Sequence, residues 1–112
     1  NRFFPLLKAA ALNGDDFVMS QGEQIRDISE IGESIEILYK ESKRIFNSEE
    51  SDVRIKNVGS GRNLSMKDFA SKMWNELGAR GNLKIGHLPY RNREIMRYVP
   101  DLESEYIVCN FD

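Results

Sequence analysis

The sequence predicts an α/β or α+β fold, with about three main helices and a small mixed sheet of short strands. Three segments place apolar residues at helical spacing: residues 3–12, 29–46 and 65–77. Shorter alternating runs lie between them and are bounded by Gly, Asn and Asp. The chain has 112 residues and is 40% hydrophobic, which suits a single domain or a fragment over residues 1–112.

The first predicted helix covers residues 3–12. Asn13-Gly14 is expected to end it, because both residue types tolerate a left-handed backbone. Residues 17–20 then form a predicted short strand. The turn signal at residues 21–23 predicts that residues 24–28 return beside that strand as its hairpin partner.

Residues 29–46 form the longest predicted helix. Asp27 or Ser29 is expected to cap its start by accepting a hydrogen bond from a free backbone N–H group. One face carries an apolar stripe, and most of the charged residues lie off it. The stripe consists of Ile31, Ile35, Leu38, Ile45 and Phe46, interrupted by Ser42. Residues 47–52 are a predicted polar loop.

Residues 53–58 alternate apolar and polar side chains, as a half-buried strand does. A tight loop is expected over residues 59–63. Ser65 and Asp68 have the spacing that begins a capped helix, and Gly78 is expected to follow its end. The apolar face of this helix consists of Met66, Phe69, Ala70, Met73, Trp74 and Leu77.

Residues 83–87 are a predicted strand, and residues 88–101 follow it as a segment with three arginines, two tyrosines and two prolines. We call residues 88–101 the arginine segment. Its prolines favour an extended chain. The planar guanidinium groups of its arginines can donate paired hydrogen bonds to phosphate or carboxylate oxygens. It predicts either an anion-binding loop or a solvated surface loop. Asp101 is expected to cap a short last helix.

Composition and charge exclude several classes of function. A formal net charge of -2 does not favour broad nucleic-acid or membrane binding, and the longest apolar run is too short to cross a bilayer. The single cysteine, Cys109, cannot form an internal disulfide, which fits a reducing compartment such as the cytoplasm. With His87 as the one histidine, no metal site is expected.

No catalytic residues emerge from spacing. Glu94 and Asp101 could form a carboxylate pair, although charged runs are usually solvated. Residues 59–61 read Gly-Ser-Gly, but the third position of a dinucleotide-binding G-x-G-x-x-G fingerprint is Leu64, so a structural turn is predicted. Outside the arginine segment, Arg26 is a further candidate anion-binding residue, because Arg26 and Arg91 could bind one anion together.

In order and spacing, four stretches together resemble the C-terminal part of NAD-dependent nucleotide-sugar epimerases and dehydratases, the extended short-chain dehydrogenases. The stretches are Gly22-Glu23-Gln24-Ile25-Arg26-Asp27, Lys56-Asn57-Val58-Gly59-Ser60-Gly61, the helix from Ser65 to Leu77, and Leu88-Pro89-Tyr90-Arg91 with Glu94-Ile95-Met96-Arg97-Tyr98-Val99-Pro100-Asp101. The resemblance runs from Phe3 to about Leu102.

The resemblance implies a nucleotide-sugar-binding lobe without its Rossmann half. Arg26 and Arg91 are the implied substrate-binding residues, gripping the substrate diphosphate. The strand at residues 53–58 is implied to rejoin the Rossmann sheet, and Asp101 to cap the final helix. NAD or NADP would bind mainly outside this chain, with none expected on the chain alone. The implied partners are a nucleotide-diphosphate sugar, the missing Rossmann domain and a further copy in a homo-oligomer, with no nucleic acid and no membrane.

The chain also departs from this family. It has no glycine-rich NAD loop and no Tyr-x-x-x-Lys pair, since Tyr39 is followed directly by Lys40. Residues 28–33 differ from the usual sequence after Arg-Asp, and no lysine-rich helix follows Asp101. Two alternatives therefore stay open: a stand-alone binding or interaction module that has lost catalysis, and a small nucleic-acid-binding domain, which the acidic balance disfavours.

Overall fold

The computed structural model describes residues 3–49 and 53–108, and this part contains three helices and seven short strands. Strand pairs of both directions occur, which confirms the predicted α/β or α+β class. The chain divides into two compact units. Unit 1 is Asn1–Arg26 with Leu64–Tyr98, and unit 2 is Asp27–Asn63 with Val99–Asp112. The prediction of one domain or fragment over residues 1–112 stays a prediction.

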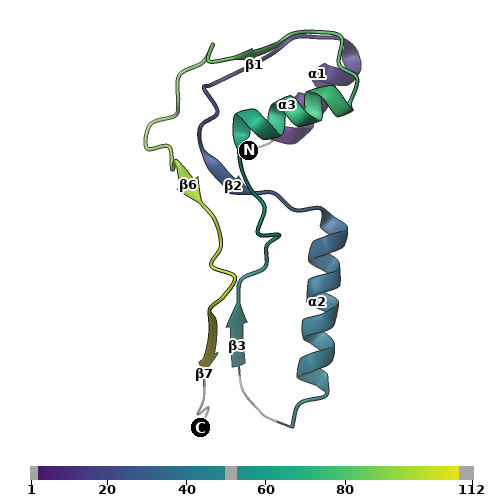
Figure 1. Cartoon of the computed structure of the whole chain (residues 1–112), viewed down its shortest axis with the longest axis vertical. Helices are drawn as coiled ribbons and strands as arrows, with labels where there is room; N and C mark the ends of the chain where they lie inside the picture. Colours follow the sequence, from purple (N-terminus) through teal and green to yellow (C-terminus); the bar gives the residue numbers. More distant parts are fainter. Residues whose placement is uncertain (1–2, 50–52, 109–112) are drawn as a thin grey trace. The chain divides into compact units, whose positions relative to one another are not determined.

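The core of unit 1 lies where helix α1 (Phe3–Asn13) packs on helix α3 (Met66–Glu76), as Figure 1 shows. The sequence predicts both helices well because their ends are local. Ser65 Oγ accepts a hydrogen bond from the Asp68 backbone N–H at 3.2 Å, and Gly78 follows α3 with a φ of 63°. The buried core residues are Leu7, Ala11, Met19, Ala70 and Trp74.

Strand β1 (Phe17–Met19) pairs in parallel with strand β5 (Leu83–Ile85). The predicted hairpin between residues 17–20 and 24–28 is therefore wrong. Strand β2 (Ile25–Asp27) pairs instead in parallel with strand β6 (Arg97–Tyr98) and lies between β6 and strand β4 (Asn63–Ser65). Residues 20–24 connect β1 to β2 without the predicted turn, and both strands pair with segments far away in the sequence.

Unit 2 contains helix α2 (Ile31–Phe46) and the antiparallel pair of strand β3 (Val53–Lys56) with strand β7 (Glu105–Val108). Ion pairs join these elements. Glu41 contacts Lys56 Nζ at 2.7 Å and Arg44 Nη2 at 2.7 Å, and Arg44 also contacts Glu105 at 2.7 Å. The hydrogen bonds from Lys56 and Arg44 lower the pKa of Glu41 below its usual value.

Two predicted helix caps are wrong. The N-cap residue of α2 is Glu30, which makes no side-chain capping hydrogen bond, so neither Asp27 nor Ser29 caps this helix. The expected final helix is absent from the described residues. Asp101 Oδ1 accepts hydrogen bonds from the N–H groups of Glu103 and Ser104, and this turn leads into β7 instead of a helix.

Two predictions fall partly or wholly outside the described residues: the polar loop at residues 47–52, of which 50–52 are not described, and the free thiol of Cys109. Within the described part of the chain, no helix has the length and apolar character needed to cross a membrane.

Candidate functional site

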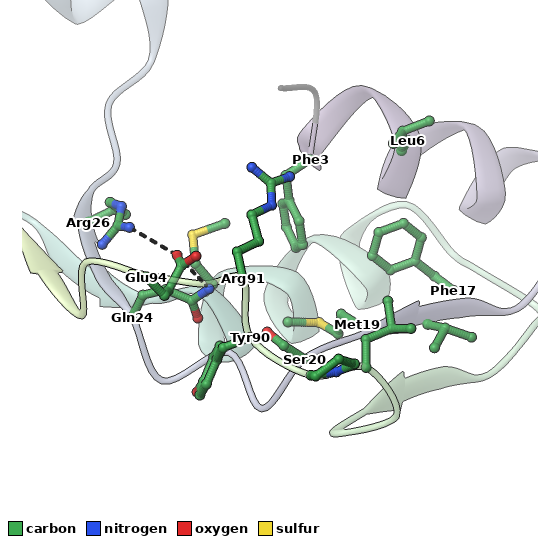
Figure 2. Close-up of a pocket in the computed structure, with 14 residues that line it drawn as sticks. Phe3, Leu6, Phe17, Met19, Ser20, Gln24, Arg26, Tyr90, Arg91 and Glu94 are labelled. Atoms are coloured by element: carbon green, nitrogen blue, oxygen red, sulfur yellow. Dashed lines mark hydrogen bonds and ion pairs between the residues drawn. The ribbon is translucent and has the colours of Figure 1, made fainter.

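Unit 1 contains a cavity of about 330 Å³ that brings the two predicted arginines together. Arg26 comes from β2 and Arg91 from the arginine segment, and both side chains line it (Figure 2). The other lining residues are Phe3, Leu6, Phe17, Val18, Met19, Ser20, Gln24, Met66, Leu88, Pro89, Tyr90 and Glu94. The cavity thus has an apolar part from α1, β1 and α3 and a polar part from β2 and the arginine segment.

Arg26 is held in place at the cavity wall. Its Nη1 donates a hydrogen bond to the Ile25 carbonyl oxygen at 2.9 Å, and its Nη2 lies 3.4 Å from Glu94 Oε1. The side chains of Arg26 and Glu94 are 27% and 18% exposed, so this ion pair is half-buried. A guanidinium has five N–H donors, and these contacts leave further donors for a ligand.

The ion pair between Glu94 and Arg26 is the feature of this site that sequence reasoning missed. Glu94 Oε1 also accepts a hydrogen bond from Gln24 Nε2 at 3.2 Å, and dashed lines in Figure 2 mark both contacts. The Glu94 carboxylate contacts Gln24 and Arg26, and its possible pairing with Asp101, which belongs to unit 2, stays a prediction. Gln24 and Arg26 lie 70 and 68 residues away from Glu94 in the chain, so no local pattern predicts these contacts.

Backbone contacts fix the arginine segment beside β1 and β2. At its start, the N–H of Leu88 donates to the Met19 carbonyl at 3.3 Å, and towards its end the N–H of Ile25 donates to the Met96 carbonyl at 2.7 Å. Between them, the Tyr90 hydroxyl accepts a hydrogen bond from the Glu23 N–H at 3.0 Å. No helix forms between residues 88 and 98, as predicted, but the segment is not extended throughout because residues 92–93 form a turn.

A turn lies between Arg91 and Glu94, and both residues line the cavity. The N–H of Glu94 donates to the Arg91 carbonyl at 3.2 Å, and Arg93 in this turn has a φ of 61°. The Arg93 and Arg97 side chains are exposed and do not line the cavity. Among the three arginines of the segment, Arg91 is therefore the one that contributes to the cavity wall.

The lining combines cations with acceptors. Two arginines and one glutamate give the lining side chains a formal charge of +1. Among the described residues, Gln24 Oε1 is a buried side-chain atom without a hydrogen-bond partner in the protein. Leaving such an acceptor unpaired costs about 1–3 kcal/mol. A ligand that offers anionic oxygens and a hydroxyl donor would match this wall, because the arginines supply donors and Glu94 supplies an acceptor.

The apolar part of the cavity is built by side chains that also pack on the core. The rings of Phe3 and Phe17 meet edge to face with centroids 5.6 Å apart. Phe3, Phe17 and Met66 are partly buried against the core residues. Such a wall next to charged groups is typical of pockets for small molecules with an apolar and a polar end.

The Gly-Ser-Gly turn in unit 2 is already filled by a carboxylate of the same chain. Asp27 accepts hydrogen bonds from the Ser60 N–H at 2.9 Å, the Gly61 N–H at 2.8 Å and the Ser60 hydroxyl at 3.1 Å. Partial burial raises the pKa of Asp27, but these hydrogen bonds and the charge of Arg62 together lower it below 3.8. The turn thus has the structural role predicted for it, since these amides point at Asp27.

Other candidate groups are not assembled into a site. His87 is exposed. No three His, Cys, Asp or Glu side chains in the described part of the chain are grouped to hold a metal ion.

Comparison of the chain with protein-family models, with curated proteins and with solved structures found no match.

Proposed function

We propose that this chain is the substrate-binding part of an NAD(P)-dependent nucleotide-sugar epimerase, dehydratase or reductase. In this proposal the cavity of unit 1 holds a nucleotide-diphosphate sugar, and Arg26 and Arg91 bind its diphosphate. The observation that supports it is the presence of both arginines in the wall of one cavity, although they lie far apart in the chain.

The chemistry of the lining supports the same class of ligand. A nucleotide sugar presents phosphate oxygens, hydroxyl groups and flat or apolar ring faces. The arginines suit the phosphates, Glu94 offers an acceptor for a hydroxyl, and the apolar part of the wall suits a ring face. Charge-assisted contacts to phosphate contribute about 1.5–3 kcal/mol each.

Catalysis and cofactor binding would come from outside these residues. We propose that a Rossmann domain supplies NAD or NADP and the Tyr-x-x-x-Lys pair, and that the enzyme acts in the cytoplasm. The Gly-Ser-Gly turn is not the proposed cofactor site, because its amides bind Asp27.

An NMR titration of the 112-residue chain with nucleoside-diphosphate sugars of different bases tests the proposal. We expect amide shifts to move at Gln24, Arg26 and residues 90–94. Arg91→Ala is expected to weaken binding by roughly 10-fold to 150-fold, since one charge-assisted contact is lost. Arg97→Ala, which removes an exposed arginine of the same segment outside the cavity, is the matched control and should bind as the unaltered chain does.

The proposal fails if millimolar nucleotide sugars leave the shifts of the cavity residues unchanged. Equal weakening of binding by Arg91→Ala and Arg97→Ala would also contradict the proposal. Such a result would show that the nucleotide sugar is attracted by the general positive charge of the segment and not by Arg91 in the cavity. Binding of short single-stranded RNA with the same shifts would favour the nucleic-acid alternative.

A further inference from the structure

Glu94 places a carboxylate in the wall of a cavity whose two arginines suit anions. Its Oε1 lies 3.4 Å from Arg26 Nη2 and 3.2 Å from Gln24 Nε2, and its side chain is 18% exposed. A carboxylate in this position weakens the attraction of Arg26 for a phosphate, because the carboxylate and the phosphate carry charges of the same sign. The proposed diphosphate site thus contains a group that opposes part of the binding.

Two unfavourable features accompany the placement of Glu94. The turn before it contains Arg93 with a φ of 61°, a conformation that residues other than glycine rarely adopt. Gln24 donates from Nε2 to Glu94, and its Oε1 is buried without a hydrogen-bond partner among the described residues. Unusual backbone conformations and unpaired polar atoms concentrate at functional sites. Both features therefore favour a role for Glu94 in ligand binding over a purely structural one.

A phosphate bound to Arg26 would have Glu94 as its neighbour. An oxygen that accepts a hydrogen bond from Arg26 Nη2 would lie within roughly 6 Å of Glu94 Oε1, given the 3.4 Å between these two atoms. At roughly 6 Å in water-like surroundings, each additional unit of negative charge on the ligand changes its affinity about threefold. The carboxylate therefore distinguishes between ligands by the charge of the phosphate next to Arg26.

We propose that Glu94 determines specificity by favouring a sugar-linked diphosphate over a free nucleoside diphosphate. This inference rests on the proposed function, since it concerns the ligand of the same cavity. A phosphate esterified to a sugar carries one negative charge, whereas a terminal phosphate carries close to two above neutral pH. Glu94 repels the additional charge of the terminal phosphate. It accepts a hydrogen bond from a hydroxyl of the sugar, because an ionised carboxylate is an acceptor only.

The arrangement of the lining suits this orientation of the ligand. In Figure 2, Arg26 and Glu94 lie together at one end of the lining, and Phe17 lies at the other end. The Arg91 side chain lies between these ends in the same view. A ligand with its diphosphate across the two arginines would have its sugar beside Glu94 and its nucleoside towards the apolar part of the cavity.

Isothermal titration with matched ligand pairs tests the inference, with UDP against UDP-glucose and GDP against GDP-mannose at about pH 8. We expect Glu94→Gln to bind the nucleoside diphosphate roughly tenfold more tightly than the unaltered chain does, and the nucleotide sugar at most about threefold more tightly. The preference for the nucleotide sugar should therefore fall by about threefold or more. Glu94→Asp, which keeps the carboxylate, should retain the preference.

Glu23→Gln is the matched control, because Glu23 is exposed, does not line the cavity and removes the same charge. It should leave the preference unchanged. If a nucleotide sugar binds but Glu94→Gln leaves the preference unchanged, or Glu94→Asp abolishes it, the inference is wrong and the proposed function stands. If the unaltered chain binds none of the four ligands, the proposed function is wrong and the inference is wrong with it.

Discussion

The Asp27 carboxylate binds Ser60 by both its backbone N–H and its hydroxyl, across 33 residues of sequence. Gly61 adds a third donor at 2.8 Å, so one side chain fixes the whole Gly-Ser-Gly turn. The backbone approaches closely here: a Cβ atom on Gly59 would lie 3.0 Å from Asp27 Oδ2 and 2.8 Å from Pro100 Cγ. The turn and its anion therefore form one structural element.

Asp27→Asn is expected to destabilise unit 2 by about 1–2 kcal/mol at pH 7, because charge-assisted hydrogen bonds are replaced by neutral ones. The folded-state pKa of Asp27 is depressed, so its contribution is present above the unfolded value near 3.8 and is lost as the pH falls through the lower folded pKa. The stability difference between variant and unaltered chain should therefore vanish in strong acid.

Amide NMR shifts of Ser60 and Gly61 followed through acid titration measure this effect directly. Their midpoint should lie below 3.8. Asp15→Asn, at an exposed aspartate, is the control and should leave both the shifts and the stability unchanged. A midpoint at or above the ordinary aspartate value would show that the three hydrogen bonds do not favour the ionised form.

Gly22→Ala is expected to destabilise unit 1 and to disturb the cavity. Gly22 has a φ of 65°, and an added Cβ would lie 2.7 Å from both Lys67 N and Met19 Cε. Gly78→Ala is a matched control, because Gly78 has a similar φ of 63° but nothing within 4 Å of an added Cβ. We expect a cost of roughly 1 kcal/mol at Gly78 and at least about 1–3 kcal/mol more at Gly22.

Urea denaturation followed by Trp74 fluorescence compares the two glycine variants within the same unit. If they are equally destabilised, backbone strain alone explains the requirement for glycine at both positions. In that case the close approach of Gly22 to α3 would have no energetic role.

Local sequence predicted those parts of the fold whose determinants are local. Ser65 with Asp68 and then Gly78 define α3 within a few residues of its ends, and the structure confirms this helix. The partner of β1 was mispredicted because β1 pairs with β5, more than sixty residues later, and no turn signal encodes a parallel pairing over that distance.

The same limit applied to the candidate site. Arginine chemistry was enough to select Arg26 and Arg91, but the shared cavity depends on β2 pairing with β6. For Glu94 the sequence suggested either a carboxylate pair with Asp101 or ordinary solvated charge, because its partners Gln24 and Arg26 are distant in sequence. For α2, periodicity predicted which residues share a face, and it carried no information on whether that face is covered.

Glu94→Gln provides a charge test of the cavity that rests on the proposed function. Removing the one carboxylate from a lining that contains two arginines raises its formal charge by one, and phosphate oxygens would no longer compete with Glu94 for Arg26. We expect inorganic pyrophosphate to bind roughly threefold to tenfold more tightly at low salt, with the gain shrinking as salt screens the charges.

Isothermal titration with pyrophosphate measures this gain, and Glu23→Gln is the matched control. Glu23 is exposed and adjacent to the cavity wall without lining it, so its loss changes the net charge equally but should alter affinity much less. Weaker pyrophosphate binding by Glu94→Gln would contradict the prediction. It would mean that Glu94 serves mainly to orient Arg26. The gain in anion affinity from that orientation would then exceed the loss caused by the negative charge of Glu94.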